Sequence, residues 1–299
     1  MTKTEKIVLL LGIIAVLVMA VILVLFLALP SPSPTPASHT QSTAQATAIA
    51  EEPTDPTEEI IWDIIPDIGP DIAGSNVPRN RFGPEDFEYG EDGYLTCTAE
   101  PCMLGIDVSS YQGKIDWQQV KAAGISFVMI RVGGRGYGQA GNLFADQKAQ
   151  EYYAGAKQAG LLVGAYFFSQ ALNTEEALEE AKFALELTKD WEMDLPLAFD
   201  WEFVNDDGRS ATSDMYTVAM CTRAFCDEIR LAGRDAMVYV SMWFGYPYFE
   251  EFQDYPTWIA LYTDEMDYAY EFRMWQYTAS GSVPGIKGDV DMNIYFPPQ

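Results

Sequence analysis

The chain has 299 residues, a formal net charge of −26 and a single histidine, His39. A protein this acidic is repelled by phosphate backbones, so we expect no nucleic-acid partner. One histidine excludes a Ser-His-Asp or Cys-His nucleophile and a zinc site built on histidines, so any chemistry must depend on carboxylates, hydroxyls and amides.

The first predicted element is a membrane anchor in residues 1–30. Ile7 to Leu29 is an uninterrupted apolar run, long enough to cross a hydrocarbon core of about 30 Å. Lys3 and Lys6 precede it, which favours a cytoplasmic N-terminus. The run is longer than the apolar core of a cleavable signal peptide. We therefore predict an uncleaved single-pass anchor in the cell membrane, with the lipid bilayer as a partner and the rest of the chain extracellular.

Residues 31–92 are predicted to form an extended, disordered linker. Their composition is rich in Pro, Ser and Thr and then acidic, which is typical of a solvated and self-repelling spacer. An apolar island interrupts it at residues 58–68. This island is either a docking motif for another protein or a segment that packs loosely on the folded domain or on nothing.

Four cysteines are few for a disulfide scaffold. Cys97 and Cys102 flank a short loop and can bridge outside the cell, a question that the sequence leaves open. Cys221 and Cys226 lie five apart on a predicted helix, where their Cα atoms exceed the limit of about 7 Å for a mutual bond. We expect these two to be buried thiols.

From residue 93 to residue 299 strand and helix signals alternate. Strands are expected at 103–108, 127–132, 161–168, 196–203, 236–241, 257–261, 272–276 and 290–295, and helices at 145–159, 174–189 and 212–231. This order predicts an α/β domain, an irregular TIM-like (β/α) barrel with few helices in its last third. The chemistry of such barrels lies at the carboxyl ends of the strands, where Asp107, Ser169, Asp200, Glu202 and Ser241 fall.

The strand around Asp200 carries two carboxylates on an otherwise apolar segment. Asp200 and Glu202 are two residues apart, so both side chains point to one face of the strand. Neighbouring anions in an apolar setting raise one of the two pKa values, and such a pair cleaves glycosidic bonds. The alternatives are a solvated strand end or half of a metal site.

Five ordered motifs between about residue 104 and residue 296 resemble glycoside hydrolase family 25, the Chalaropsis-type lysozymes (N-acetylmuramidases). The motifs are Gly105-Ile106-Asp107-Val108-Ser109-Ser110-Tyr111-Gln112-Gly113 with Ile115-Asp116-Trp117, residues 127–133, residues 164–171, Asp200-Trp201-Glu202, and residues 274–277 with 288–293. Five motifs in order are far more specific than any one alone.

The resemblance implies roles for four carboxylates. Glu202 matches the general acid that protonates the glycosidic oxygen, and Asp200 matches the carboxylate that stabilises the 2-acetamido group of the substrate. Asp107 and Asp291 match the other two acidic residues of the site. Asp289 stands at a variable position of its motif and is ranked below Asp291.

The resemblance also implies a substrate-binding set. Tyr166 matches an aromatic residue that lines the sugar subsite. Trp275 and Tyr277 are expected to stack on sugar faces, with burial in the core as the alternative for one of them. Tyr239 and Gln112 complete the predicted set.

The implied function is a membrane-anchored peptidoglycan hydrolase that cuts the β-1,4 bond between N-acetylmuramic acid and N-acetylglucosamine. We expect no metal and no cofactor, and a hard-cation site among the clustered aspartates is the alternative. Two other functions stay open, an inactive wall-binding or scaffold module and a hydrolase of another amino-sugar polymer. The sequence leaves open whether cleavage is retaining, inverting or substrate-assisted, together with the preferred wall modification, the biological role and the oligomeric state.

Overall fold

The structure is a computed structural model that describes residues 78–204, 208–241, 253–263 and 266–298. The predicted anchor in residues 1–30, the linker up to residue 77 and the island at 58–68 lie outside the described residues. No helix within the described ranges has the length and apolar character needed to cross a membrane.

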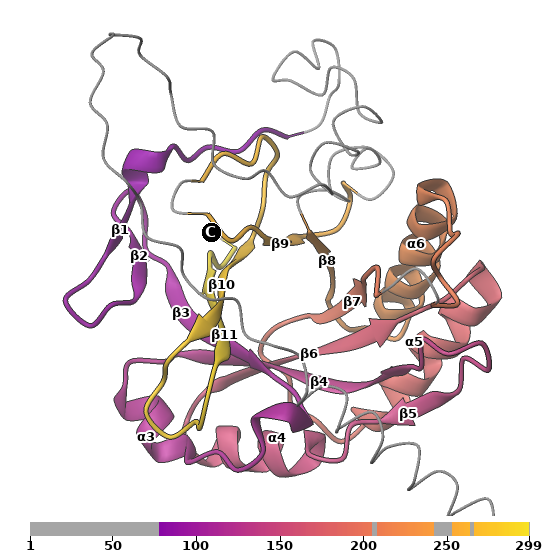
Figure 1. The fold of residues 1–299 in the computed structure, drawn as a ribbon, viewed down its shortest axis with the longest axis horizontal. Helices are drawn as coiled ribbons and strands as arrows, with labels where there is room; N and C mark the ends of the chain where they lie inside the picture. Colours follow the sequence, from indigo (N-terminus) through magenta and orange to yellow (C-terminus); the bar gives the residue numbers. More distant parts are fainter. Residues whose placement is uncertain (1–77, 205–207, 242–252, 264–265, 299) are drawn as a thin grey trace, which may run out of the picture. The chain divides into compact units, whose positions relative to one another are not determined.

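Eight strands of the described chain close into a barrel (Figure 1). In sheet order they are β3 (Met103–Val108), β11 (Val290–Tyr295), β10 (Met274–Gly281), β9 (Thr257–Ala260), β8 (Ala236–Ser241), β7 (Leu197–Trp201), β6 (Leu162–Ser169) and β4 (Phe127–Arg135). Pairing of β3 with β4 completes the ring. The predicted α/β barrel is confirmed, and the predicted strands at 103–108, 236–241 and 290–295 match the observed bounds.

Strand direction decides which residues meet at each end of the barrel. Neighbouring strands from β3 through β4 and on to β10 run parallel, whereas β11 runs antiparallel to both of its neighbours. The amino end of β11 therefore lies at the same edge as the carboxyl ends of the other strands. In this register Asp291 stands directly opposite Asp107.

Helices cover one part of the barrel. They are α3 (Trp117–Ala122), α4 (Ala149–Gln158), α5 (Thr174–Leu187) and α6 (Met215–Leu231). The side chains of Asp116, Asn173 and Asp214 cap α3, α5 and α6 by accepting a backbone N–H of the first turn. The described residues after β8 contain no helix, as predicted for the last third.

The helix predicted at 145–159 begins later than expected. Residues Leu143–Ala145 form strand β5, which pairs antiparallel with Gly133–Arg135 at the end of β4. This pairing extends β4 beyond the barrel and creates an arm at its edge (Figure 1). Tertiary pairing overrides the helical pattern at this end, because the extended backbone finds a partner strand.

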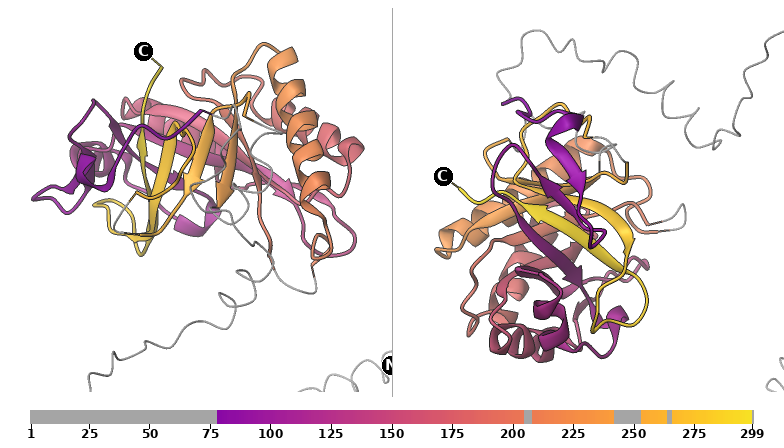
Figure 2. Two further views of the ribbon diagram at one scale, coloured as in Figure 1. Left: turned by 90° about the horizontal axis from the view of Figure 1, so that it is seen from above. Right: turned by 90° about the vertical axis from the view of Figure 1, so that its left-hand side faces the viewer.

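The N-terminal boundary of the folded domain lies earlier than the predicted residue 93. Strand β1 (Phe87–Tyr89) pairs with β2 (Leu95–Cys97), and a short 3-10 turn (Pro84–Asp86) precedes β1. Phe82 is buried and stacks on Phe296 with ring centroids 4.6 Å apart. Figure 2 shows this segment lying against the β10 and β11 side, where helices are absent from the described chain. Residues 78–92 therefore belong to the domain, because they cover apolar surface that helices cover elsewhere.

All four cysteines are free thiols. Cys221 and Cys226 are buried on α6, as predicted, and burial raises the pKa of Cys221 to about 12. Near the hairpin, the backbone N–H of Cys97 donates to the Cys102 sulfur at 3.4 Å.

Candidate active site

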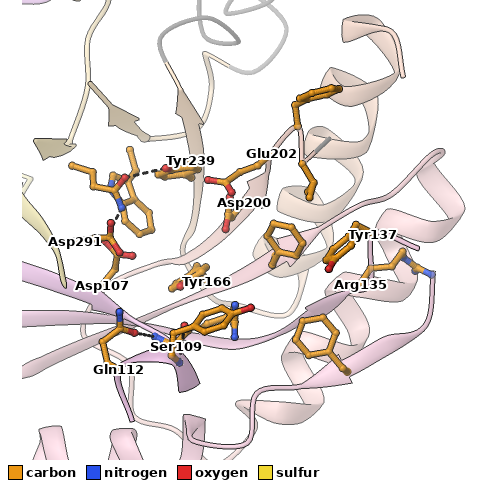
Figure 3. Close-up of a pocket in the computed structure, with 18 of the residues that line it drawn as sticks. Asp107, Ser109, Gln112, Arg135, Tyr137, Tyr166, Asp200, Glu202, Tyr239 and Asp291 are labelled. Carbon is orange, nitrogen blue, oxygen red and sulfur yellow. Dashed lines mark hydrogen bonds between the residues drawn. The ribbon is translucent and has the colours of Figure 1, made fainter. Parts of the chain in front are cut away.

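A cleft of about 620 Å³ opens at the carboxyl ends of the parallel strands (Figure 3). Seven residues predicted from the sequence line it: Asp107, Gln112, Tyr166, Asp200, Glu202, Tyr239 and Asp291. They come from strands that are far apart in the chain. Closure of the barrel brings them to one edge.

The carboxyl pair at the end of β7 has the predicted geometry, with both side chains on one side of the chain. Asp200 and Glu202 both line the cleft, whereas Trp201 between them is buried in the outer core. Asp200 is buried near the end of the strand, and Glu202 follows the strand with its side chain partly exposed. The backbone carbonyl of Glu202 accepts a hydrogen bond from the buried Gln170 side chain at 2.8 Å, which fixes the chain where it leaves β7.

A network of buried amides and hydroxyls holds Asp107. Its Oδ2 accepts hydrogen bonds from the amides of Gln276 and Asn293, each at 2.8 Å. The Trp258 indole N–H donates to Asn293 Oδ1 at 2.8 Å, and the Tyr239 hydroxyl donates to Gln276 Oε1 at 3.0 Å. These donors fix the orientation of both amides. Two N–H donors on one oxygen favour the ionised form of Asp107.

Asp200 differs from Asp107 in its hydrogen bonding. Its carboxyl is buried, yet Oδ1 has no hydrogen-bond partner within the described residues. Leaving a buried acceptor without a donor costs about 1–3 kcal/mol. An oxygen of this kind is suited to accept an N–H or O–H group from a ligand.

Burial is the main cause of raised pKa values at all four carboxyls. It raises the pKa of Asp107 and Asp200 well above the ordinary range, raises that of Asp291 to about 6, and raises that of Glu202. The negative charges of Asp291 and Glu202 add to the shifts at Asp107 and Asp200 respectively, whereas the Arg131 guanidinium lowers the pKa of Asp200. The cluster therefore retains protons at a pH where isolated carboxyls are ionised.

Exposed aromatic rings surround the cleft. Five exposed aromatic side chains line it: Tyr111, Tyr137, Phe144, Phe203 and Tyr262. Large apolar side chains gathered in this way at a concave site are typical of a binding surface. The combination of such rings with a buried carboxyl cluster suits a polar ligand with apolar faces, such as a sugar chain.

Comparison with known proteins agrees with this geometry. The family model described as glycosyl hydrolases family 25 matches residues 106–286. The chain belongs to glycosyl hydrolase family 25. The autolytic lysozyme of Clostridium acetobutylicum is 30% identical over 195 residues, which are 64% of this chain and 56% of that protein. Lysozyme M1 of Streptomyces globisporus is 28% identical over 212 residues, covering 64% of this chain and 67% of that protein.

A solved structure of the modular autolysin LytC from Streptococcus pneumoniae has the same fold. The two chains superpose with a TM-score of 0.59 at 25% sequence identity, over 74% of this chain and 52% of LytC. The chain thus spans only about half the length of the autolytic lysozyme and of LytC.

Two predicted substrate-binding residues lie outside the cleft. Trp275 is completely buried, packs edge-on against Phe87 with ring centroids 5.0 Å apart, and donates its indole N–H to the Leu261 carbonyl. Tyr277 is buried against Tyr89 on the same outer side of β10. Neither ring faces the cleft, because side chains alternate along β10 and this alternation turns both rings outward. Burial in the core, the alternative stated for one of them, holds for both.

The same alternation turns Gln276 into the cleft, where the sequence analysis had assigned it no role. Side chains alternate between the two faces of a strand, so residues 274–277 predict that Gln276 faces the cleft, but only once one of its neighbours is known to face outward. Asp289 is exposed and does not line the cleft, in agreement with its lower rank.

Further residues of the family 25 cleft received no role from the sequence, although several of them stand within the five motifs. The cleft residues that the sequence analysis did not assign are Ser109, Tyr111, Arg131, Arg135, Gly136, Tyr137, Phe144, Phe168, Phe203, Val204, Trp258, Tyr262 and Gln276. Many of them lie on loops or on the β4–β5 arm, where no hydrophobic period predicts the direction of a side chain.

The cation alternative can be examined at Asp107. Within the described residues, no group of three or more Asp, Glu, His or Cys side chains is arranged to hold a metal ion. The two amide hydrogens that point at Asp107 Oδ2 occupy directions that a cation bound to this oxygen would need.

Proposed function

We propose that this family 25 chain is a peptidoglycan hydrolase, an N-acetylmuramidase that cuts the β-1,4 bond between N-acetylmuramic acid and N-acetylglucosamine. The observation that carries the proposal is the meeting of Asp107, Asp200, Glu202 and Asp291 in one cleft with an aromatic rim. The lysozymes and the autolysin among its relatives support the same reaction class.

Glu202 acts as the general acid. It is the carboxyl that reaches into the cleft from beyond the end of β7, and burial raises its pKa, which keeps a proton available for the leaving oxygen. A hydrogen bond from the Tyr239 hydroxyl lowers the pKa of Glu202 and so offsets part of the effect of burial. Burial is the larger of the two effects, so the pKa of Glu202 stays raised.

Asp200 stabilises the 2-acetamido group of the sugar. Its unpaired Oδ1 accepts the acetamide N–H, which aligns the acetamide oxygen for attack on the anomeric carbon. This route is the substrate-assisted one, which we favour over direct retention or inversion. Asp107 and Asp291 lower the energy of the cationic transition state as it forms in the partly water-excluded cleft.

The substitution Glu202→Gln tests the proposal. In a fragment comprising residues 78–299, loss of the proton donor is expected to lower the release of new reducing ends from muramic-acid-containing walls by at least about 100-fold. Asp289→Asn is the matched control, because Asp289 is an exposed carboxyl two residues from Asp291 and outside the cleft. Near-full turnover by Glu202→Gln would contradict the assignment of the acid. Wall binding by the unaltered protein without any reducing ends would instead favour an inactive binding module.

We also propose that the full chain is anchored in the cell membrane through Ile7 to Leu29 with its catalytic domain outside. The apolar run and the preceding Lys3 and Lys6 support this topology. The full chain is expected in the membrane fraction after an alkaline wash and in the soluble fraction once residues 7–29 are deleted. Release of the undeleted chain by the alkaline wash would contradict the anchor.

A further inference from the structure

Basic as well as acidic side chains line the cleft. Asp107, Asp200, Glu202 and Asp291 gather toward one end, whereas Arg135 and Tyr137 lie toward the other (Figure 3). A ligand in the cleft therefore meets acceptors and protons at the four carboxyls and donors at the basic side chains. Cleavage of the glycan uses the four carboxyls and leaves the donors of the basic side chains without a function.

Arg131 is a fixed cation of the cleft, and its charge lowers the pKa of Asp200. We call Arg131, with the neighbouring rings of Tyr111 and Phe144, the donor end of the cleft. Nε and Nη2 of Arg131 bind Asp146 at 2.9 Å and 2.7 Å, and its guanidinium carbon lies 5.1 Å from the ring centroid of Tyr111 and 5.8 Å from that of Phe144. Asp146 is also held by two backbone N–H groups, of Ser110 and Lys148. The remaining nitrogen of Arg131, Nη1, makes no hydrogen bond to the described residues, and the side chain lines the cleft.

Arg135, the other basic side chain that lines the cleft, is already paired. The Arg135 guanidinium binds Glu179, Glu180 and the Gly141 carbonyl, so it has little capacity left for a ligand. Gln112 adds a further donor to the cleft, because its Oε1 accepts the Ser109 N–H while its Nε2 donates to no described residue. The donors left for a ligand are thus Arg131 Nη1 and an amide, set among exposed aromatic rings.

We propose that this donor end binds the acidic peptide carried by the 3-O-lactyl group of the glycan, an inference that rests on the proposed muramidase function. Arg131 Nη1 donates to a carboxylate or carbonyl oxygen of that peptide, and Tyr111 and Phe144 pack against its apolar side chains. Burial already disfavours negative charge at Asp107 and Asp200, so a peptide carboxylate is accommodated at Arg131 rather than among the four carboxyls. This difference selects the orientation of the strand. The enzyme then prefers strands that carry peptides over strands that have lost them.

The test compares kcat/KM on soluble peptidoglycan strands with their stem peptides and on the same strands after an amidase has removed the peptides. Because a hydrogen bond from a charged donor is lost, Arg131→Gln is expected to lower the ratio of the two kcat/KM values by about tenfold. Arg230→Gln is the matched control, since Arg230 also stacks on a tyrosine ring, that of Tyr255, but outside the cleft. Equal kcat/KM values of the unaltered enzyme on the two strands, or an unchanged ratio in Arg131→Gln, would overturn the proposal.

Two further measurements separate this inference from the proposed function. Tyr111→Ala alters a side chain that is 85% exposed and is expected to lower the same ratio without unfolding the domain. Binding of a soluble muramoyl peptide to Glu202→Gln, measured by calorimetry, is expected to weaken about tenfold when Arg131→Gln is added. Absence of cleavage by the unaltered enzyme refutes the muramidase function, whereas equal peptide binding with and without Arg131 refutes the peptide site alone.

Discussion

Replacement of Asn293 by leucine tests how the buried network controls the cleft. Asn293 is completely buried and supplies one of the two amide donors to Asp107 Oδ2, at 2.8 Å. Asn293→Leu removes this donor and leaves the Gln276 amide as the other one. Leucine has a similar volume, so the change acts mainly on hydrogen bonding.

The size of the effect follows from the charge on the acceptor. A hydrogen bond to a charged group contributes about 1.5–3 kcal/mol, and one pKa unit corresponds to about 1.4 kcal/mol, so the pKa of Asp107 should rise by about 1–2 units. The direction is upward because the lost donor favoured the ionised form. If the transition state needs ionised Asp107, the acidic limb of the profile of kcat/KM against pH moves to higher pH by the same amount.

The assay is release of reducing ends across the acidic and neutral pH range, with thermal unfolding measured at each pH. Trp258→Phe is the control, because it removes the donor to Asn293 Oδ1 but leaves both amides facing Asp107. Its acidic limb is expected to move by less than about half a pH unit, as the second donor acts only through Asn293. A folded Asn293→Leu enzyme whose acidic limb stays in place, or moves to lower pH, would refute the reasoning.

Three further predictions concern stability and the corrected assignments. Burial raises the pKa of Glu180 to about 7 despite its pairing with Arg135. Because the pKa of Glu180 is higher in the folded state than in the unfolded state, the contribution of Glu180 to the free energy of unfolding is largest below about pH 4.5. This contribution falls by about 3 kcal/mol as the pH rises through 7. Glu180→Gln should flatten this dependence in denaturation series, and parallel curves would contradict it. Phe82→Ala is expected to lower the free energy of unfolding, measured in urea, by about 3–5 kcal/mol. A decrease below about 1 kcal/mol would indicate that residues 78–92 belong to the linker and not to the folded domain. Tyr277→Phe should leave kcat/KM unchanged. A tenfold fall in kcat/KM would indicate that Tyr277 contacts the substrate after all.

The sequence alone predicted the features that depend on local pattern. Alternation along the β7 segment predicted that Asp200 and Glu202 share a face, because adjacent side chains of any strand point to opposite sides. The order of strand and helix signals predicted the barrel and its helix-poor last third. The single histidine already restricted the chemistry to carboxylates, hydroxyls and amides.

Only the tertiary structure decided which face of a strand points inward and which way the last strand runs. Trp275 and Gln276 on β10 are both buried, so hydrophobicity cannot tell the cleft side from the outer side. The antiparallel direction of β11 places Asp291 opposite Asp107, and nothing within residues 290–295 specifies that direction. Residues 78–97 were assigned mostly to the linker because their apolar side chains find partners only on distant strands. Periodicity is a local property of the chain. The face of a strand that points into the barrel, the direction in which a strand runs and the segment that covers an apolar surface are all set by residues far away in the sequence.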